Sequence, residues 1–362
     1  MNIAIIGAGP IGCYTGYLLA KAGNEVTIYE NHPQIGSPIQ CTGLLTSDFD
    51  QFNLPTESFL VNTFNHIEVN SPGGKRTTIQ QKEYLVCRIK FDNFFADIAR
   101  KAGASIYVNH SFQRKEGNAL IIKDVVNKIE KTITPDRVIA ADGPLSPTAK
   151  AYGFYHPQRE NYYGIQATVT GNFDPATYYT YFGKQVCPGL FAWIVPESAT
   201  TARVGVGTTK NTKHYFDQFM KSHNFVAQDI QAGAIPIYHP DQELQRENCY
   251  LVGDASTYVK ATTLGGLVPA LHQAQILSDC IISGKEYHTE IHPVKKKMWL
   301  HLKMRRIFDK FSDADWDKLV GYINQPKILR ILETHTRENP LPILLRSIVR
   351  EPRFLYFAKY VW

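Results

Sequence analysis

Three glycines and one acid near the N-terminus have the spacing of a dinucleotide-binding turn. The segment 7–12, GAGPIG, follows a short apolar run and precedes a helical pattern. Gly7 permits a tight turn, Gly9 lets the backbone approach a pyrophosphate, and Gly12 lets the helix pack on the strand. Glu30 follows 23 residues after Gly7, where its carboxylate can accept hydrogen bonds from an adenosine ribose. The alternative is a glycine-rich turn without a ligand. We predict cofactor binding by Gly7, Gly9, Pro10, Ile11, Gly12 and Glu30.

A second glycine and acid pair occurs far along the chain. A short strand at 250–252 turns at Gly253 and Asp254, and Gly265 and Gly266 open a long amphipathic helix. A second carboxylate and a second helix N-terminus are more than NAD needs, and they suit FAD. Asp254 would hold a ribityl hydroxyl, and the helix dipole would stabilise negative charge on the reduced flavin. The residues predicted to bind FAD here are Gly253, Asp254, Gly265, Gly266 and Leu267.

Two further charged residues stand at element ends. Arg88 precedes a helical pattern that stops at Gly103, and its guanidinium is placed to neutralise phosphates. Asp142 ends the strand-like run 137–141 and is followed by Gly143. Each of them alone is equally consistent with a surface turn or a helix terminus, but their order along the chain matches the two glycine and acid sites.

Together these segments resemble the FAD-dependent oxidoreductases of the glutathione-reductase-like superfamily, in the para-hydroxybenzoate hydroxylase-type branch. Within that branch the chain is most similar to the geranylgeranyl reductases. The resemblance covers about residues 1–290. Three stretches carry it: GSPIQCTGLLT at 36–46, YFGKQVCPGLFAWIVPESATTARVGVGT at 181–208, and GDASTYVKATTLGGLVPAL at 253–271.

The resemblance implies hydride transfer from reduced FAD to a carbon–carbon double bond of a prenyl chain. It places Cys41 beside the flavin, either as a proton donor or as a small polarizable wall. Phe191 and Trp193 would line an apolar tunnel, although aromatics at alternate positions of a strand are also typical of plain core. We therefore predict Cys41, Phe191 and Trp193 as catalytic residues, with Cys41 also contacting the cofactor, and Lys260–Thr263 near flavin or substrate.

Three positions depart from the family pattern. Phe191 replaces a tyrosine, Val195 a phenylalanine, and Leu264 the first of three glycines. Phe191 has no hydroxyl, so proton donation from that position is lost. Leu264 adds bulk where the backbone should approach the flavin.

The order of the motifs predicts an α/β chain (α+β overall) with a discontinuous flavin domain. We assign residues 1–58, 86–155 and 246–284 to a Rossmann-like FAD-binding domain of glutathione-reductase type. Residues 59–85 and 156–245 read as an antiparallel-sheet substrate domain, with a hairpin around Ser71. Residues 285–362 read as a helical, basic region.

Charge and cysteine content bear on partners and compartment. Residues 285–362 hold 16 basic and 9 acidic side chains, so the chain's net charge of +6 belongs to this region. It is either a solvated helical face or a contact for an anionic membrane surface. No nucleic-acid motif accompanies it. The six cysteines form no CxxC pair and no metal spacing, which favours a reducing, cytoplasmic setting and no metal. The sequence shows neither a signal peptide nor a transmembrane run.

Alternatives of other classes remain. A flavin-dependent monooxygenase or halogenase of the same fold shares a similar aromatic-Trp-x-Ile-Pro stretch, and a non-catalytic flavin- or lipid-binding protein would keep the fold. No second GxGxxG unit for a nicotinamide is present, because the segment after Gly207 lacks the third glycine. Electrons would therefore come from NAD(P)H visiting transiently or from a protein such as ferredoxin. The expected substrate is an isoprenoid lipid.

Overall fold

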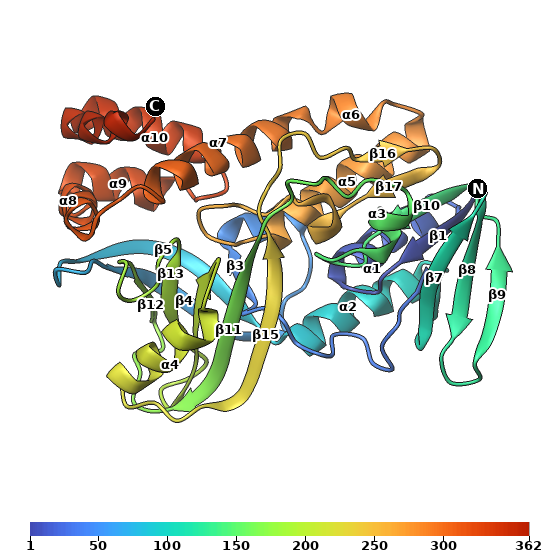
Figure 1. Cartoon of the computed structure of the whole chain (residues 1–362), viewed down its shortest axis with the longest axis horizontal. Coiled ribbons are helices and arrows are strands. Elements are labelled where there is room, and N and C mark those ends of the chain that lie inside the picture. The colour runs from blue at the N-terminus through green and yellow to red at the C-terminus, as the bar shows by residue number, and fades with distance from the viewer. Residues whose placement is uncertain (362) are drawn as a thin grey trace.

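Residues 1–361, which the computed structural model describes, form three sheets and a group of C-terminal helices (Figure 1). The first sheet is parallel except for one edge strand, β16. In spatial order its strands are β16 (Gln245–Arg246), β17 (Cys249–Leu251), β10 (Arg137–Ala140), β1 (Asn2–Ile6), β2 (Glu25–Tyr29) and β6 (Ser105–Tyr107). The helices α1 (Pro10–Lys21), α2 (Arg88–Lys101) and α5 (Leu267–Ser283) belong to this part of the chain, with the short α3 (Pro147–Ala151) after β10.

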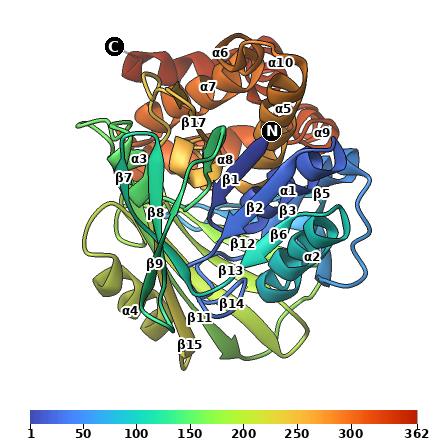
Figure 2. The same cartoon turned by 90° about the vertical axis from the view of Figure 1, so that its right-hand side faces the viewer.

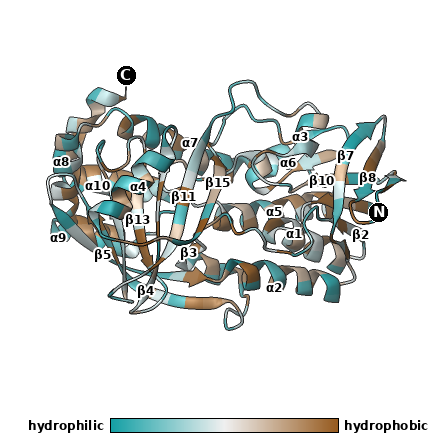
Figure 3. Cartoon of the chain, turned by 60° about the horizontal axis from the view of Figure 1, so that its bottom comes forward, coloured by the Kyte–Doolittle hydropathy of each residue, from teal (hydrophilic) through white to brown (hydrophobic). Residues whose placement is uncertain are grey.

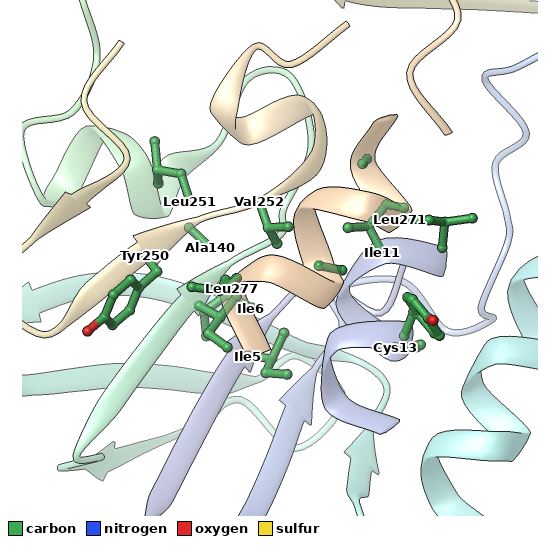
Figure 4. Close-up of a cluster of buried hydrophobic side chains, with 14 of the residues drawn as sticks. Ile5, Ile6, Ile11, Cys13, Ala140, Tyr250, Leu251, Val252, Leu271 and Leu277 are labelled. Atoms are coloured by element: carbon green, nitrogen blue, oxygen red, sulfur yellow. The ribbon is translucent and has the colours of Figure 1, made fainter. Parts of the chain in front are cut away.

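The core of this part explains its sequence. Ile3, Ile5 and Ile6 of β1 are buried, as the nearly continuous apolar run predicts for a parallel strand covered on both faces. Helix α1 packs against both α2 and α5. Figure 4 shows the side chains of β1, β10, β17, α1 and α5 meeting in one cluster. The predicted Rossmann-like domain is therefore present.

The second sheet has eight strands. Its spatial order is β15 (Gln228–Pro236), β11 (Asn161–Thr170), β14 (Thr201–Thr208), β13 (Phe191–Pro196), β12 (Thr177–Tyr181), β4 (Leu60–Asn70), β5 (Arg76–Val86) and β3 (Leu44–Thr46). The predicted hairpin around Ser71 is β4–β5. A small meander, β7 (His110–Glu116), β8 (Ala119–Asp124) and β9 (Ile129–Ile133), forms the third sheet.

Three details of the second sheet differ from the sequence-based expectation. The sheet is not wholly antiparallel, because β12 pairs with β4 in parallel. The long connection from β5 through the first sheet lets β12 return in the same direction as β4, as a parallel pair requires. Strand β3 pairs with β5, although the sequence analysis assigned its residues to the flavin domain. The last elements, α4 (Thr212–Ser222) and β15, were not expected.

The C-terminal region is helical, as predicted. It comprises α6 (Tyr287–Glu290), α7 (His292–Phe308), α8 (Asp313–Ile323), α9 (Pro326–Thr334), α10 (Pro340–Arg350) and a 3-10 segment (Pro352–Tyr360). Figures 1 and 2 show α7 and α10 along the top of the molecule, with the eight-stranded sheet below. Within residues 1–361 no helix is both long and apolar enough to cross a bilayer.

An aromatic cluster fixes these helices on the sheet. Trp316 of α8 is buried with Phe311 and Phe357. Its ring stacks on Phe182, with centroids 4.4 Å apart, and Phe182 in turn contacts Phe191 of β13 at 5.6 Å. A continuous row of rings therefore runs from the sheet into the C-terminal region.

We predict that Trp316→Ala lowers the free energy of unfolding by about 3–5 kcal/mol, because it opens a cavity in this cluster. Chemical denaturation followed by circular dichroism measures the change. Trp299→Ala is the matched control, since Trp299 lies half-exposed on α7. Equal effects of the two substitutions would contradict a structural role for the cluster.

Candidate active site

A continuous cavity of about 670 Å³ runs from the first sheet to the second. It brings together the motifs that the sequence separates by more than two hundred residues. Gly12 lies outside the lining. The other predicted residues line it: Gly7, Gly9, Pro10, Ile11, Glu30, Cys41, Arg88, Asp142, Phe191, Trp193, Gly253, Asp254, Gly265, Gly266 and Leu267.

The three N-terminal glycines serve different ends. A Cβ on Gly7, whose φ is +103°, would lie 2.5 Å from the carbonyl oxygen of Ala141. A Cβ on Gly12 would lie 2.1 Å from the carbonyl oxygen of Gly7. A Cβ on Gly9 would meet no protein atom within 4 Å and would enter the cavity. Gly7 and Gly12 thus allow the turn and helix to pack, and Gly9 leaves room for a ligand.

Two helices present their N-termini to the cavity. Helix α1 begins after Gly9 and α5 after Gly266, and neither N-cap residue makes a side-chain capping bond. Both glycines line the cavity. The first N–H groups of a helix lack intrahelical partners and carry the positive end of the dipole, so each terminus favours an anion.

The three predicted acids have different surroundings. Glu30 accepts hydrogen bonds from the backbone N–H of Ala8 at 2.8 Å and of His32 at 3.0 Å, which orient it at the end of β2. Among residues 1–361, no group donates a hydrogen bond to the side chain of Asp254, and burial raises the pKa of its carboxyl. This carboxylate is therefore free to accept from a ligand hydroxyl.

Asp142 is engaged by the protein itself. Its carboxylate accepts from the Ser146 hydroxyl and from the backbone N–H of Thr148 at 3.0 Å. These bonds hold the turn before α3. Asp142 thus shapes the cavity wall, with less capacity for a ligand than the sequence analysis expected.

Arg88 is held in place by a buried partner. Its guanidinium makes two bonds of 3.0 Å to the carboxylate of Asp92, one turn further along α2. Burial opposes the charge on Arg88, but Asp92 and the nearby Cys41 raise its pKa above the ordinary value. The guanidinium therefore stays charged beside the cavity, with Cys41 close to it.

Arg159 was missed by the sequence analysis. Its Nη2 donates to the carbonyl oxygens of Pro144 at 2.8 Å and Asp254 at 2.9 Å, and its Nη1 to Ala255 at 3.1 Å. It therefore joins the two acid–glycine turns. No motif surrounds this arginine, so no sequence signal pointed to it.

The turn that carries Cys41 is fixed by the second sheet. Arg203 of β14 donates to the carbonyl oxygens of Thr42 and of Val86, the latter at 3.1 Å. The Thr42 hydroxyl bonds the side chain of Gln166 on β11 at 2.7 Å. Residues 41–43 are therefore bonded to the second sheet, and Cys41 takes its position from that sheet.

The aromatic wall lies on β13 and β14. Phe191 and Trp193 line the cavity with ring centroids 6.0 Å apart. A Cβ on Gly205 would lie 2.5 Å from the Trp193 ring, so this glycine makes room for the indole. Within the described residues the buried Nε1 of Trp193 has no hydrogen-bond acceptor.

Leu264 occupies glycine-like backbone. Its φ is +57°, in the left-handed region that a side chain rarely adopts. Its side chain lines the cavity and approaches the Cβ position of Gly207 to 3.1 Å. The Leu264 side chain therefore takes up cavity space where the wall of β14 meets the start of α5.

A network of buried charged residues lies beside the cavity. Lys260, Glu338 and Thr46 form one group, in which Lys260 pairs with Glu338, and the Thr46 hydroxyl donates to Glu338 at 2.9 Å. Burial lowers the pKa of Lys260. Burial alone would raise the pKa of Glu338, but Lys260 and Arg337 hold it below its ordinary value.

The neighbouring group consists of Arg337, Glu83 and Tyr178. Arg337 pairs with the carboxylate of Glu83, with Nη2 to Oε2 at 2.7 Å, and donates to the Tyr178 hydroxyl at 3.1 Å. Arg337 and Tyr178 line the cavity. The sequence analysis missed these residues because they lie in three elements distant along the chain.

The site is a Rossmann-like sheet with two uncapped helix N-termini, joined by one cavity to a second sheet, and this arrangement suits an oxidoreductase that binds a dinucleotide cofactor. The sequence comparisons agree. Residues 5–65 match the NAD(P)-binding Rossmann-like domain, and residues 161–235 match the geranylgeranyl reductase catalytic domain.

Whole-chain comparisons point the same way. The chain is 28% identical to a digeranylgeranylglycerophospholipid reductase of Methanocaldococcus jannaschii, over 90% of both chains. It is 27% identical to digeranylgeranylglycerophospholipid reductase 2 of Methanothermobacter thermautotrophicus, over 92% of this chain and 96% of the relative. The predicted resemblance to the geranylgeranyl reductases is confirmed.

Solved structures share the fold. A geranylgeranyl bacteriochlorophyll reductase-like protein of Thermoplasma acidophilum superposes with a TM-score of 0.85 at 23% identity, over 100% of this chain and 99% of that one. A flavin-dependent brominase superposes with a TM-score of 0.70 at 15% identity, over 98% and 99%.

The glycine geometry predicts opposite effects of two alanine substitutions. Gly12→Ala should lower the free energy of unfolding of the cofactor-free protein by about 1–3 kcal/mol, and with it the melting temperature, because the new Cβ would meet backbone atoms. Gly9→Ala should leave that temperature unchanged and weaken cofactor binding by on the order of tenfold. Calorimetry with and without cofactor separates the two. Unchanged cofactor affinity in Gly9→Ala would argue against a phosphate site at α1.

The charge network predicts a pH effect. The folded-state pKa of Glu338 is lowered, so its stabilising contribution is present above the unfolded pKa and is lost as the pH falls through the folded one. Glu338→Gln leaves Lys260 buried without its partner and should cost about 3–5 kcal/mol at neutral pH. Denaturant titrations across pH 3–7 measure both the cost of the substitution and the fall of stability with decreasing pH. Adding Lys260→Met to Glu338→Gln should recover part of the lost stability. If Glu338→Gln shows the same fall of stability at acidic pH as the parent protein, the pairing is refuted.

Proposed function

We propose that this protein is an FAD-dependent reductase that saturates carbon–carbon double bonds in the geranylgeranyl chains of membrane lipids. One observation carries the proposal. The aromatic wall of β13, within the segment that matches the geranylgeranyl reductase catalytic domain, lines the same cavity as both glycine–acid turns. The curated relatives named above are reductases of such lipids.

The residues present fit FAD. Gly9 and the N-terminus of α1 would receive the pyrophosphate, and Glu30 the adenosine ribose. Asp254, whose carboxylate lacks a donor among residues 1–361, would accept from the ribityl chain. Arg88 adds positive charge near the phosphates, and the N-terminus of α5 favours negative charge on the pyrimidine side. Reduced FAD supplies the hydride for the reaction.

An isolated alkene accepts hydride poorly, so the protein must deliver a proton to the other carbon and keep water away. Phe191, Trp193 and Leu264 provide an apolar wall that holds the double bond and excludes water. Cys41, which the second sheet fixes beside the cavity, is our candidate for the proton donor. Phe191 has no hydroxyl and therefore acts by shape.

Electrons and location complete the proposal. The flavin would be reduced by NAD(P)H or by a protein carrier such as ferredoxin. We expect the protein in the cytoplasm, with a peripheral contact between its basic C-terminal region and the anionic inner face of the membrane. No nucleic acid is involved.

Oxygen-dependent chemistry is the second candidate, since a flavin-dependent brominase shares the fold. The comparisons favour the reductase, because residues 161–235 match a reductase domain. A monooxygenase or halogenase consumes O2, whereas the reductase does not.

The test is an anaerobic incubation of FAD-loaded protein, reduced with dithionite, with digeranylgeranyl glycerophospholipid. Mass spectrometry should show a gain of two hydrogens for each saturated bond. Cys41→Ala should keep FAD and lose turnover by on the order of a hundredfold, because a positioned proton donor contributes about that much. Cys280→Ala, a buried thiol on α5, is the control and should retain activity.

Two results would reject the proposal. Reduced, FAD-loaded protein that leaves the lipid mass unchanged would remove the reductase activity. Protein that takes up no FAD would support a non-catalytic lipid-binding role.

A further inference from the structure

Helix α10 turns part of its apolar surface toward solvent. Its sequence, PLPILLRSIVR, has six leucine, isoleucine or valine residues among eleven. Its fully buried residues are Pro340 and Ser347, and Ile343, Leu344 and Ile348 are partly buried. A helix packed for stability alone would turn its apolar stripe inward and its serine outward.

The outward face of α10 is a continuous apolar stripe. Leu341, Leu345 and Val349 are 50%, 55% and 78% exposed. Their spacing of four residues places them on one side of the helix. Leu355, just beyond α10, is also exposed. We call Leu341, Leu345 and Val349 the α10 stripe.

Positive charge accompanies the α10 stripe. Arg346 and Arg350 are exposed on the same helix, and within residues 1–361 neither forms an ion pair. Helix α7, which contacts α10, exposes Lys296, Trp299 and Lys303 at helical spacing. Figure 3 shows hydrophobic and hydrophilic residues mixed along α10. An apolar stripe flanked by unpaired arginines, beside a basic helix with an exposed tryptophan, suits an anionic lipid surface.

The opposite side of α10 reaches the cavity. Ile343 of α10 and Leu332 of α9 both line it, and the two helices are in contact. Only the width of helix α10 therefore separates the α10 stripe from the cavity that the aromatic wall lines. A lipid chain leaving a bilayer under α10 would have a short, apolar path to that wall.

We propose that the α10 stripe docks on an anionic bilayer and sets the part of the cavity lined by α9 and α10 next to the membrane surface. The proposal rests on the proposed function for its lipid substrate, and it adds the surface that meets the lipid. The stripe enters the headgroup region, and Arg346 and Arg350 contact lipid phosphates.

The test compares Leu345→Gln/Val349→Gln with the parent protein, both FAD-loaded, in flotation with phosphatidylglycerol and phosphatidylcholine vesicles. The parent should bind phosphatidylglycerol, and the double variant should bind at least about tenfold more weakly, because less apolar area enters the bilayer. Arg346→Gln/Arg350→Gln should lose the preference for phosphatidylglycerol and its sensitivity to salt. Val226→Gln, at a 76% exposed valine elsewhere on the surface, is the matched control and should bind like the parent.

Activity measurements separate this inference from the proposed function. The double variant should reduce vesicle-embedded lipid about tenfold more slowly and a detergent-dispersed prenyl substrate at the parent rate, since its cavity is intact. Loss of activity in both formats by the parent protein itself would reject the reductase function and leave the vesicle result to decide docking.

Two outcomes would overturn the docking proposal. One is equal flotation of the parent protein and the Leu345→Gln/Val349→Gln variant with phosphatidylglycerol vesicles. The other is a parent dimer in sedimentation velocity that the double variant converts to monomer without any change in vesicle binding, which would assign the stripe to a second copy of the chain.

Discussion

The architecture depends on burying two ion pairs, Lys260–Glu338 and Arg337–Glu83, at the junction of three parts of the chain. Lys260 precedes helix α5, Glu83 belongs to the eight-stranded sheet, and residues 337–338 come from the C-terminal region. A buried charge is tolerated only with a partner, so each part requires the others to be in place. The C-terminal region is thereby a structural member of the site.

Hydrogen bonds from arginine side chains to backbone carbonyls fix other parts of the cavity wall. Arg159 joins the two acid–glycine turns, and Arg203 holds the Cys41 turn to the second sheet. Carbonyl groups at turns have few internal partners, and a guanidinium can satisfy several at once. The cavity is therefore defined by contacts between loops, while the sheets supply the rigid frame.

Two apolar side chains, Leu264 and Phe191, shape the wall of the cavity. Leu264 adopts a left-handed backbone, at a strain cost of about 1–3 kcal/mol, and its side chain fills space over Gly207. The Phe191 ring contacts Trp193 and Phe182 and carries no hydroxyl. Both side chains keep this part of the wall apolar, as a site for a hydrocarbon chain would require.

The local chemistry was readable from the sequence. Turn glycines, the acid at the end of β2, uncapped helix starts and the aromatic strand are short-range patterns, because each is set by backbone sterics or by the period of one element. They sufficed for the Rossmann-like domain, the hairpin, the C-terminal helices and a set of site residues that line one cavity, Gly12 excepted.

The tertiary structure decided those features that depend on contact between distant segments. The parallel pairing of β4 with β12, the engagement of Asp142 by Ser146, the bridging by Arg159 and the pairing of Lys260 with Glu338 have no local signature. The reason is physical: the partner of a buried charge or of a strand edge is chosen by the folded geometry, and residues 78 positions apart can satisfy each other as well as neighbours can.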